Sequence, residues 1–322
     1  MTPADLSLTV LRAVRRAVDE GVLRADPPER IKVERPRAGG RGDWATSAAL
    51  QLARTAALPP RRVAEILQAR LDGAPGVERV EITGPGFLNF TLHAASHAEL
   101  VRRVLREGLR YGHGRSLAAA DPVTFAPGRD PRAVVVTETV VALLRAQGAR
   151  AGTAPGGARE LRPLPAPGLS GAGADAVRWA FLRPGPHDRA LDPASLLAQT
   201  EANPLFTVRY AHSRARALVR NAAQLGFGAA YDTDVDAPAL LTALGDHPAV
   251  LEAAARHSAP DRVARQLEAL ADALLGFQHT VLPRGDEKPS AAHRSRLALA
   301  EAAGTVLAGG LALLGISAPD YL

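Results

Sequence analysis

Three segments in the second half of the chain repeat apolar residues at alternating spacings of three and four, which places those residues along one face of a helix. Each such face has to be buried against another. The pattern therefore predicts an all-α helical bundle from Gly173 to the end of the sequence. The three sets are Val208, Ala211, Ala215, Leu218, Ala222 and Leu225; Val263, Leu267, Leu270, Leu274, Phe277 and Val281; and Leu297, Ala300, Gly304, Leu307, Leu311 and Leu314.

The first part of the chain mixes helical and strand-like patterns. Apolar residues four apart predict a helix over 2–20, and further helices are expected at 46–55, 61–71 and 96–106. A short β-prone run covers 31–34, and two longer ones cover 77–83 and 87–92, joined by the turn-forming string GPG at 84–86. We expect an α+β domain over residues 1–112, built on a small antiparallel sheet with helices.

Residues 113–170 have a different composition. A strand at 123–125 and a helix at 134–147 are followed by glycine and proline at short intervals between Gly152 and Gly168. Such a stretch is typical of a linker. It lacks the spacing and the lysine of a phosphate-binding loop. The third part, residues 171–322, is the helical bundle.

The charge balance permits a polyanionic partner. The chain has 39 basic and 33 acidic residues, a net charge of +6 and a sequence pI near 10.4. The alternative is that an Arg-, Ala- and Gly-rich composition reflects a biased genome. The absence of cysteine excludes disulfides and cysteine-ligated zinc, and the histidines are too scattered to predict a metal site. With no long apolar run and a charged start, we expect a cytoplasmic protein without membrane contact.

Several strings resemble one known family. Residues 175–182 (DAVRWAFL), 203–206 (NPLF) and 210–214 (YAHSR) resemble the anticodon-binding helical domain of arginyl-tRNA synthetases, also called the DALR domain. The run from RLAL at 296–299 to LGISAP at 314–319 is similar to the end of that domain. Residues 42–46 (GDWAT) and 84–90 (GPGFLNF) resemble the additional N-terminal domain of the same family.

The resemblance fails in the middle of the chain. Family members bind ATP on a nucleotide-binding fold with a His-x-Gly-His motif and usually a lysine-containing loop. Residues 123–125 and 143–148 resemble the strand and helix that flank the histidine motif, but 126–132 between them reads APGRDPR. No histidine lies between His113 and His187, and the only lysines are Lys32 and Lys288. We therefore expect a truncated, degenerate paralogue, with a short catalytic-domain remnant, no catalytic residue, no cofactor and no aminoacylation by this chain alone.

For the N-terminal domain, the resemblance implies that Phe87 and Asn89 contact the elbow of a tRNA. The aromatic ring would stack on an unpaired base and the amide would read its edge. The alternative is that Phe87 and Phe90 face the core while Asn89 lies on the solvated side.

For the helical domain, the resemblance implies that Tyr210 stacks on an anticodon-loop base and that Arg214 reaches a base or phosphate. Arg209, Arg216 and Arg220 form a basic stripe on the same predicted helix, which is either part of the RNA contact or a solvated face. The family often has Tyr at position 207, Gln at position 209 and Arg-Met at the end, where this chain has Thr207, Arg209 and Tyr321-Leu322.

Three functions follow from these observations. The first is a tRNA-binding protein, regulatory or accessory, that recognises an arginine tRNA and no DNA. The second is a protein-interaction scaffold that pairs with a synthetase or another protein. The third is an ATP-dependent arginine-tRNA ligase whose missing domain a partner supplies.

Overall fold

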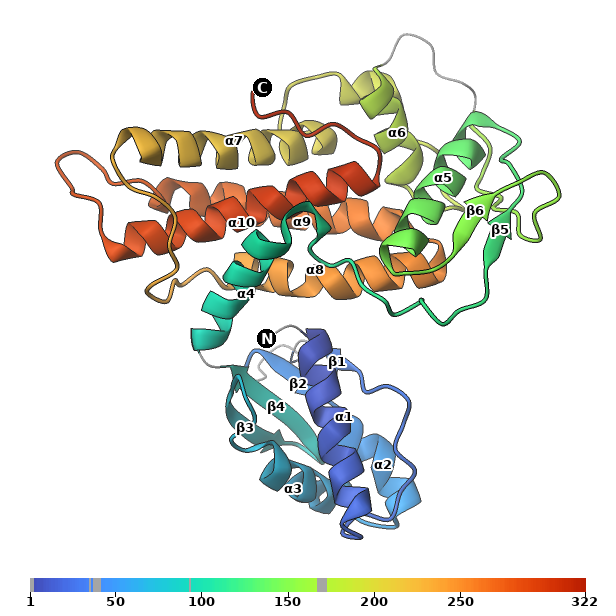
Figure 1. Ribbon diagram of the computed structural model, residues 1–322, viewed down its shortest axis with the longest axis vertical. Helices are drawn as coiled ribbons and strands as arrows, with labels where there is room; N and C mark the ends of the chain where they lie inside the picture. The colour runs from blue at the N-terminus through green and yellow to red at the C-terminus, as the bar shows by residue number, and fades with distance from the viewer. Residues whose placement is uncertain (1–2, 35, 37–41, 93, 167–172) are drawn as a thin grey trace. The chain divides into compact units, whose positions relative to one another are not determined.

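The computed structural model describes residues 3–34, 36, 42–92, 94–166 and 173–322 (Figure 1). The chain forms two compact units, Met1–Leu100 and Val101–Leu322, which are described separately. The predicted fold class is confirmed: an α+β unit with a small antiparallel sheet precedes a helical unit. The division between the two units falls within helix α4 (Ala94–Glu107), and residues 113–166 belong to the second unit.

The first unit is a four-stranded antiparallel sheet covered by helices. The sheet has the order β1-β2-β4-β3. The predicted strands 77–83 and 87–92 match β3 and β4 residue for residue. The elements are α1 (Pro3–Asp19), β1 (Val33–Glu34), β2 (Trp44–Thr46), α2 (Ala48–Ala56), α3 (Pro60–Leu71), β3 (Val77–Thr83) and β4 (Phe87–Leu92).

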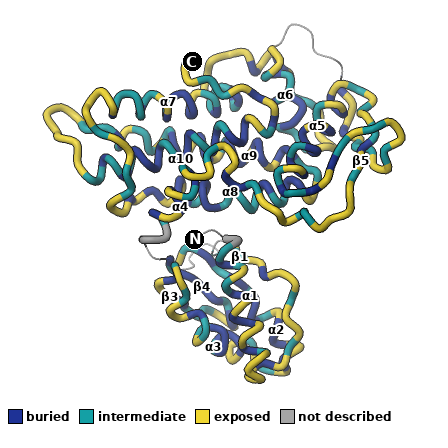
Figure 2. The backbone as a smooth tube through the Cα atoms, in the orientation of Figure 1, coloured by how far each residue is buried: buried dark blue, intermediate teal, exposed yellow. Residues whose placement is uncertain are grey.

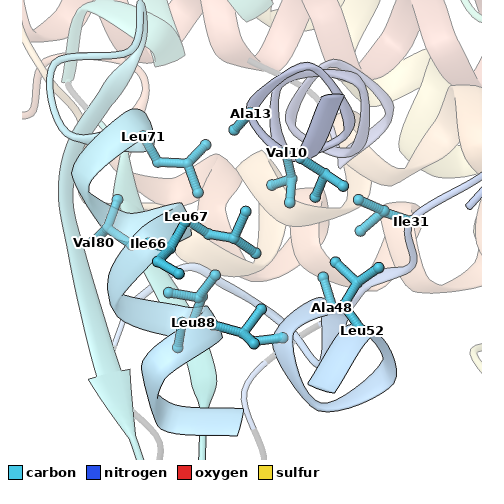
Figure 3. Packing of buried hydrophobic residues seen from close by; sticks show 14 of the residues in the cluster. Val10, Ala13, Ile31, Ala48, Leu52, Ile66, Leu67, Leu71, Val80 and Leu88 are labelled. Carbon is cyan, nitrogen blue, oxygen red and sulfur yellow. The ribbon is translucent and has the colours of Figure 1, made fainter. Parts of the chain in front are cut away.

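The core of the first unit lies between the helices and one face of the sheet. Val10 of α1, Leu67 of α3 and Leu88 of β4 are all fully buried, and Figure 3 shows them pointing toward one another. The apolar stripe predicted for α1 is thus its buried face. Burial of each such side chain contributes roughly 1.5–3 kcal/mol relative to exposure, which is enough to fix the register of the sheet.

Glycines close the sheet where the chain approaches itself. A Cβ at Gly86 would lie 2.9 Å from the backbone carbonyl of Pro60, and Gly86 has φ +145. A Cβ at Gly42 would lie 2.7 Å from the carbonyl oxygen of Phe90. Next to it, Asp43 accepts a hydrogen bond from the Leu92 backbone N–H at 2.8 Å. These close approaches explain why glycine is needed at Gly42 and at Gly86.

The second unit is a helical bundle, in which the buried faces of its long helices meet (Figure 2). The three predicted apolar stripes lie inside it, with two exceptions: Phe277 is half-buried, and Leu225 is 52% exposed because α7 ends at Gln224. The elements are α4, η1 (Gly108–Arg110), β5 (Val123–Phe125), α5 (Pro131–Ala146), β6 (Ala151–Thr153), α6 (Ala174–Leu182), η2 (Pro193–Leu196), α7 (Pro204–Gln224), α8 (Pro238–His257), α9 (Asp261–Phe277), η3 (Gln278–Thr280) and α10 (Ala291–Leu313).

Helix α10 lies at the centre of this bundle. A Cβ at Gly304 would approach the Cβ of Ala215 to 2.6 Å, and one at Gly310 would lie 2.5 Å from Leu267. The missing side chains therefore allow α10 to pack closely on α7 and α9. By length and composition α10 passes a test for a membrane-spanning helix, but 67% of its apolar window is buried in the bundle. Its apolar character is explained by that burial.

The predicted linker after residue 150 is wrong for its first part. Residues 151–153 form β6, which pairs in parallel with β5, and α5 connects the two strands. The chain then returns to β5. The backbone N–H of Ala126, directly after β5, donates to the carbonyl of Arg159 at 2.7 Å. Gly157 is needed there, since its Cβ would lie 2.3 Å from the backbone of Phe125. Gly157 therefore marks a tightly packed position rather than a free connection, and residues 167–172 lie outside the described part.

Candidate nucleic-acid interface

Phe87 and Asn89 lie on the face of the sheet opposite the helices. Strand alternation turns the fully buried Leu88 and Phe90 toward the core, and Phe87 and Asn89 the other way. Of the two, Phe87 is half-buried and Asn89 is 4% exposed, with its amide donating to Thr83 Oγ1 at 2.6 Å. A base that approaches this face therefore meets the ring of Phe87 first. The role of both residues in RNA contact stays a prediction.

Helix α7 carries the other predicted contacts, and its start is well defined. Asn203 caps it, accepting a hydrogen bond from the Phe206 N–H at 3.1 Å, and Pro204 occupies the first turn. The amide of Asn203 also donates to the carbonyls of Leu196 and Ala198, both at 2.7 Å. The Asn-Pro string therefore sets where α7 begins and how it joins η2.

Tyr210 stands on the outer ridge of α7. It is 39% exposed and stacks on Phe206, one turn earlier, with ring centroids 5.6 Å apart and planes inclined by 17°. Because the rings of i and i+4 residues hold each other, the tyrosine presents a face that is already ordered. An unpaired base can extend this stack.

Arg214 lies on one flank of that ridge. Its Nε donates to Gln278 Oε1 of η3 at 2.6 Å, which holds the guanidinium beside the helix. Tyr210 and Arg214 are four residues apart on the same helix, so the structure brings these two predicted residues together. An aromatic face next to a positioned guanidinium suits a nucleotide, with its base on the ring and its phosphate on the cation.

Arg209, Arg216 and Arg220 lie on the opposite flank, where Ser317, Asp320 and Tyr321 of a covering segment, residues 317–322, contact them. Arg209 Nη2 donates to Ser317 Oγ at 3.2 Å, and Arg216 Nε to Asp320 Oδ1 at 3.2 Å. Arg220 lies over the ring of Tyr321, 4.1 Å from its centroid. The predicted basic stripe is therefore neither a bare solvated face nor continuous with Tyr210 and Arg214.

The Asp-Ala-x-Arg string of α6 anchors the same segment. The carboxylate of Asp175 accepts from the backbone N–H of Ser317 at 3.1 Å, and it also accepts from the Ser317 hydroxyl. Arg178 Nε donates to the Leu314 carbonyl at 2.8 Å, and a Cβ at Gly315 would lie 2.6 Å from that guanidinium. The string thus has a structural role between α6 and the end of α10.

The turn between β5 and α5 places a carboxylate, and no histidine, at the start of the helix. Asp130 caps α5, with its carboxylate accepting from the N–H groups of Arg132 (3.1 Å) and Ala133 (3.2 Å). A carboxylate therefore occupies the helix N-terminus, where an anion would otherwise bind. Arg129, the exposed cation of the turn, pairs with Glu160 at 3.1 Å.

Two buried polar groups were not found from the sequence. Arg132 is fully buried, and burial lowers the pKa of its guanidinium, although Asp130 and Asp188 oppose that shift. His247 is 2% exposed, and burial lowers its pKa to about 4, with a smaller contribution from His113 in the same direction and an opposing one from the hydrogen bond to Gln266. Neither position has a sequence signal beyond its place in a helical pattern.

Two family models match the chain. The DALR anticodon binding domain matches residues 208–322, which contain Tyr210, Arg214 and the covering segment. The arginyl tRNA synthetase N terminal domain matches residues 8–92, which contain Phe87 and Asn89. The two models define a chain with an N-terminal α+β domain and a helical domain of the anticodon-binding class. Both domains come from one family, and the chain belongs to the arginyl-tRNA synthetase family.

Relatives and solved structures agree with this. An arginine–tRNA ligase of Frankia alni is 27% identical over an alignment of 555 positions that covers 100% of both chains. Since this chain has 322 residues, at least 233 of those positions (555 less 322) have no residue of this chain opposite them. An arginine–tRNA ligase of Kineococcus radiotolerans is 51% identical over 115 residues, which are 35% of this chain and 21% of that one.

The fold is similar to that of two solved synthetases. The arginyl-tRNA synthetase of Thermus thermophilus matches with a TM-score of 0.72 and 13% identity over 100% of both chains. That of Plasmodium falciparum matches with a TM-score of 0.69 and 6% identity over 99% of both. At such identities the likeness shows the fold alone.

Proposed function

We propose that this chain binds an arginine tRNA through its two synthetase-type domains and does not attach arginine by itself. The observation that carries the binding half is the ordered, exposed stack of Tyr210 on Phe206 beside Arg214. It lies on the helix with which the match to the anticodon binding domain begins. We propose an arginine tRNA because the relatives are named arginine–tRNA ligases.

The non-catalytic half rests on residues 121–166. The parallel sheet here consists of β5 and β6, within the part of the chain that is described. Its one strand-to-helix turn holds Asp130 at the helix N-terminus and no histidine. The guanidinium of Arg132 fastens this short unit to the loop after α6, through hydrogen bonds to the carbonyls of Gly185 and Asp188. We infer that this closed unit stands in place of a site for ATP.

Binding is tested by titrating the protein with a fluorescently labelled arginine tRNA transcript against a mixed tRNA pool, at several salt concentrations. The double variant Tyr210→Ala, Arg214→Ala removes the stack and its cation. Loss of base stacking alone should weaken binding by about tenfold or more, and the unmodified chain should show strong salt dependence. Arg262→Ala, which removes an exposed arginine from α9, is the charge control and should bind as the unmodified chain does.

Each half of the proposal can fail separately. Equal affinity of the double variant would place the RNA elsewhere, and no binding at low salt would refute the binding half and favour the protein-interaction role. Transfer of labelled arginine to the tRNA by the purified chain with ATP would refute the non-catalytic half. Circular dichroism of each variant checks that the helices are retained.

A further inference from the structure

Residues 317–322 lie along the flank of α7 that carries Arg209, Arg216 and Arg220. Their contacts resemble the chemistry of a bound nucleotide. The carboxylate of Asp320 faces Arg216 Nε at 3.2 Å and His212 Nε2 at 3.4 Å. The ring of Tyr321 lies under the guanidinium of Arg220. An anion on one cation and an aromatic ring on the next occupy the positions that a phosphate and a base would take.

The segment is attached most firmly at its beginning. Ser317 is held by Asp175, and Leu314 just before it by Arg178. Further on, the contacts are open to solvent: the side chain of Asp320 is 48% exposed and that of Arg216 is 45% exposed, while Tyr321 is 73% exposed. Ion pairs this exposed contribute little, and salt or a polyanion competes with them.

The backbone of Asp320 completes the cover. Its carbonyl accepts from Ser213 Oγ at 3.2 Å and from Arg220 Nη2 at 3.3 Å. One residue therefore uses its carboxylate and its carbonyl on four side chains of α7, including two of the three stripe arginines. While Asp320 stays there, Arg216 is bound to its carboxylate and Arg220 to its carbonyl.

We propose that residues 318–322 act as an internal competitor for RNA on this flank of α7. Asp320 takes the place of a phosphate and Tyr321 the place of a base, and RNA displaces both while Ser317 remains anchored. This inference rests on the proposed tRNA binding and adds its regulation: the segment lowers affinity for weakly bound RNA and leaves the Tyr210–Arg214 surface open. An RNA that engages that surface first gains Arg216 and Arg220 as it displaces the segment.

The test measures binding of the arginine tRNA transcript to the full chain and to Asp320→Asn, Tyr321→Ala and Asp121→Asn. Asp121 is exposed and far in sequence from Asp320. Asp121→Asn therefore changes the net charge as Asp320→Asn does, without touching the covering segment. Asp320→Asn should bind about two- to fivefold more tightly than Asp121→Asn, the effect expected from one or two half-exposed ion pairs. Tyr321→Ala should also bind more tightly than the unmodified chain.

Amide hydrogen exchange of the unmodified chain supplies the second readout. Addition of the transcript should slow exchange in α7 and leave residues 318–322 unprotected. Slower exchange in 318–322, or unchanged or weaker binding by Asp320→Asn, would overturn the inference and leave tRNA binding standing. Those outcomes would make the segment part of the RNA-binding platform. No binding by any of these proteins at low salt would overturn both proposals.

Discussion

Replacement of Arg132 by methionine should destabilise the second unit, because this side chain joins three separate segments. Arg132 is fully buried, and its guanidinium donates to backbone carbonyls before α6, at the end of α6 and in the loop that follows it. The acceptors are Leu164 (3.1 Å), Phe181 (3.2 Å), Pro184 (3.5 Å), Gly185 (2.9 Å) and Asp188 (2.6 Å). Methionine fills much of the volume and donates to none of them.

The size of the loss in stability depends on which of these carbonyls can hydrogen-bond to water once the guanidinium is gone. Phe181 is 1% exposed, so its carbonyl is left without a donor, whereas Pro184 and Gly185 are half-buried and can hydrate. A buried unsatisfied group costs about 1–3 kcal/mol, and the lost charged hydrogen bonds are partly offset because the guanidinium no longer has to be desolvated. We expect a loss of about 2–4 kcal/mol in the free energy of unfolding.

The assay uses the distribution of tryptophans. The chain has two, Trp44 in the first unit and the fully buried Trp179 in the second. In a Trp44→Phe background, urea unfolding followed by fluorescence reports on the second unit alone. Arg129→Met is the matched control, because Arg129 is 85% exposed and should leave the midpoint nearly unchanged. A loss below about 1 kcal/mol for Arg132→Met would show that the loop carbonyls are satisfied without it.

Two further predictions use the same assay. The pKa of His247 is near 6.5 in the unfolded chain and near 4 in the folded one, so the unfolded chain binds the proton first as pH falls. The free energy of unfolding of the second unit should therefore fall by about 3 kcal/mol between pH 6.5 and 4. His247→Gln should remove that part of the pH dependence. Equal pH profiles for the two proteins would contradict this. Gly304→Ala should destabilise by about 1–2 kcal/mol, because its Cβ meets Ala215 at 2.6 Å. Gly276→Ala, in the exposed part of α9 with open space around it, should instead stabilise by up to about 1 kcal/mol, and equal shifts would refute the steric argument.

The parts of the fold that the sequence predicted are those set by local physics. Strands β3 and β4 were placed to the residue because two β-prone runs flank a turn that only glycine accommodates at Gly86. The helical stripes were identified because period and burial coincide along α7, α9 and α10. Leu225 was misplaced because the period does not show where a helix ends.

The parts that the sequence did not predict depend on contacts between distant residues. Strand β6 is short and glycine-containing, so it forms only because it pairs with β5, a strand that the chain near Arg159 also joins. Of the candidate site, the pairing of Tyr210 with Arg214 followed from helical spacing. The cover over Arg216 and Arg220 did not, since the distance in sequence from Arg220 to Asp320 is 100 residues.

The structure of the middle segment makes it part of the bundle. A two-stranded sheet is marginal by itself, and β5 and β6 gain stability from α5, which packs on α6 and α8. Arg132 adds hydrogen bonds to the loop after α6, and Arg178 of α6 reaches both Glu138 of α5 at 3.3 Å and the end of α10. The contacts that hold this middle segment therefore continue into those that anchor residues 314–317. Loss of the middle segment would disturb the same end of α10 from which the covering segment starts, so the flank of α7 depends on contacts made far from it in sequence.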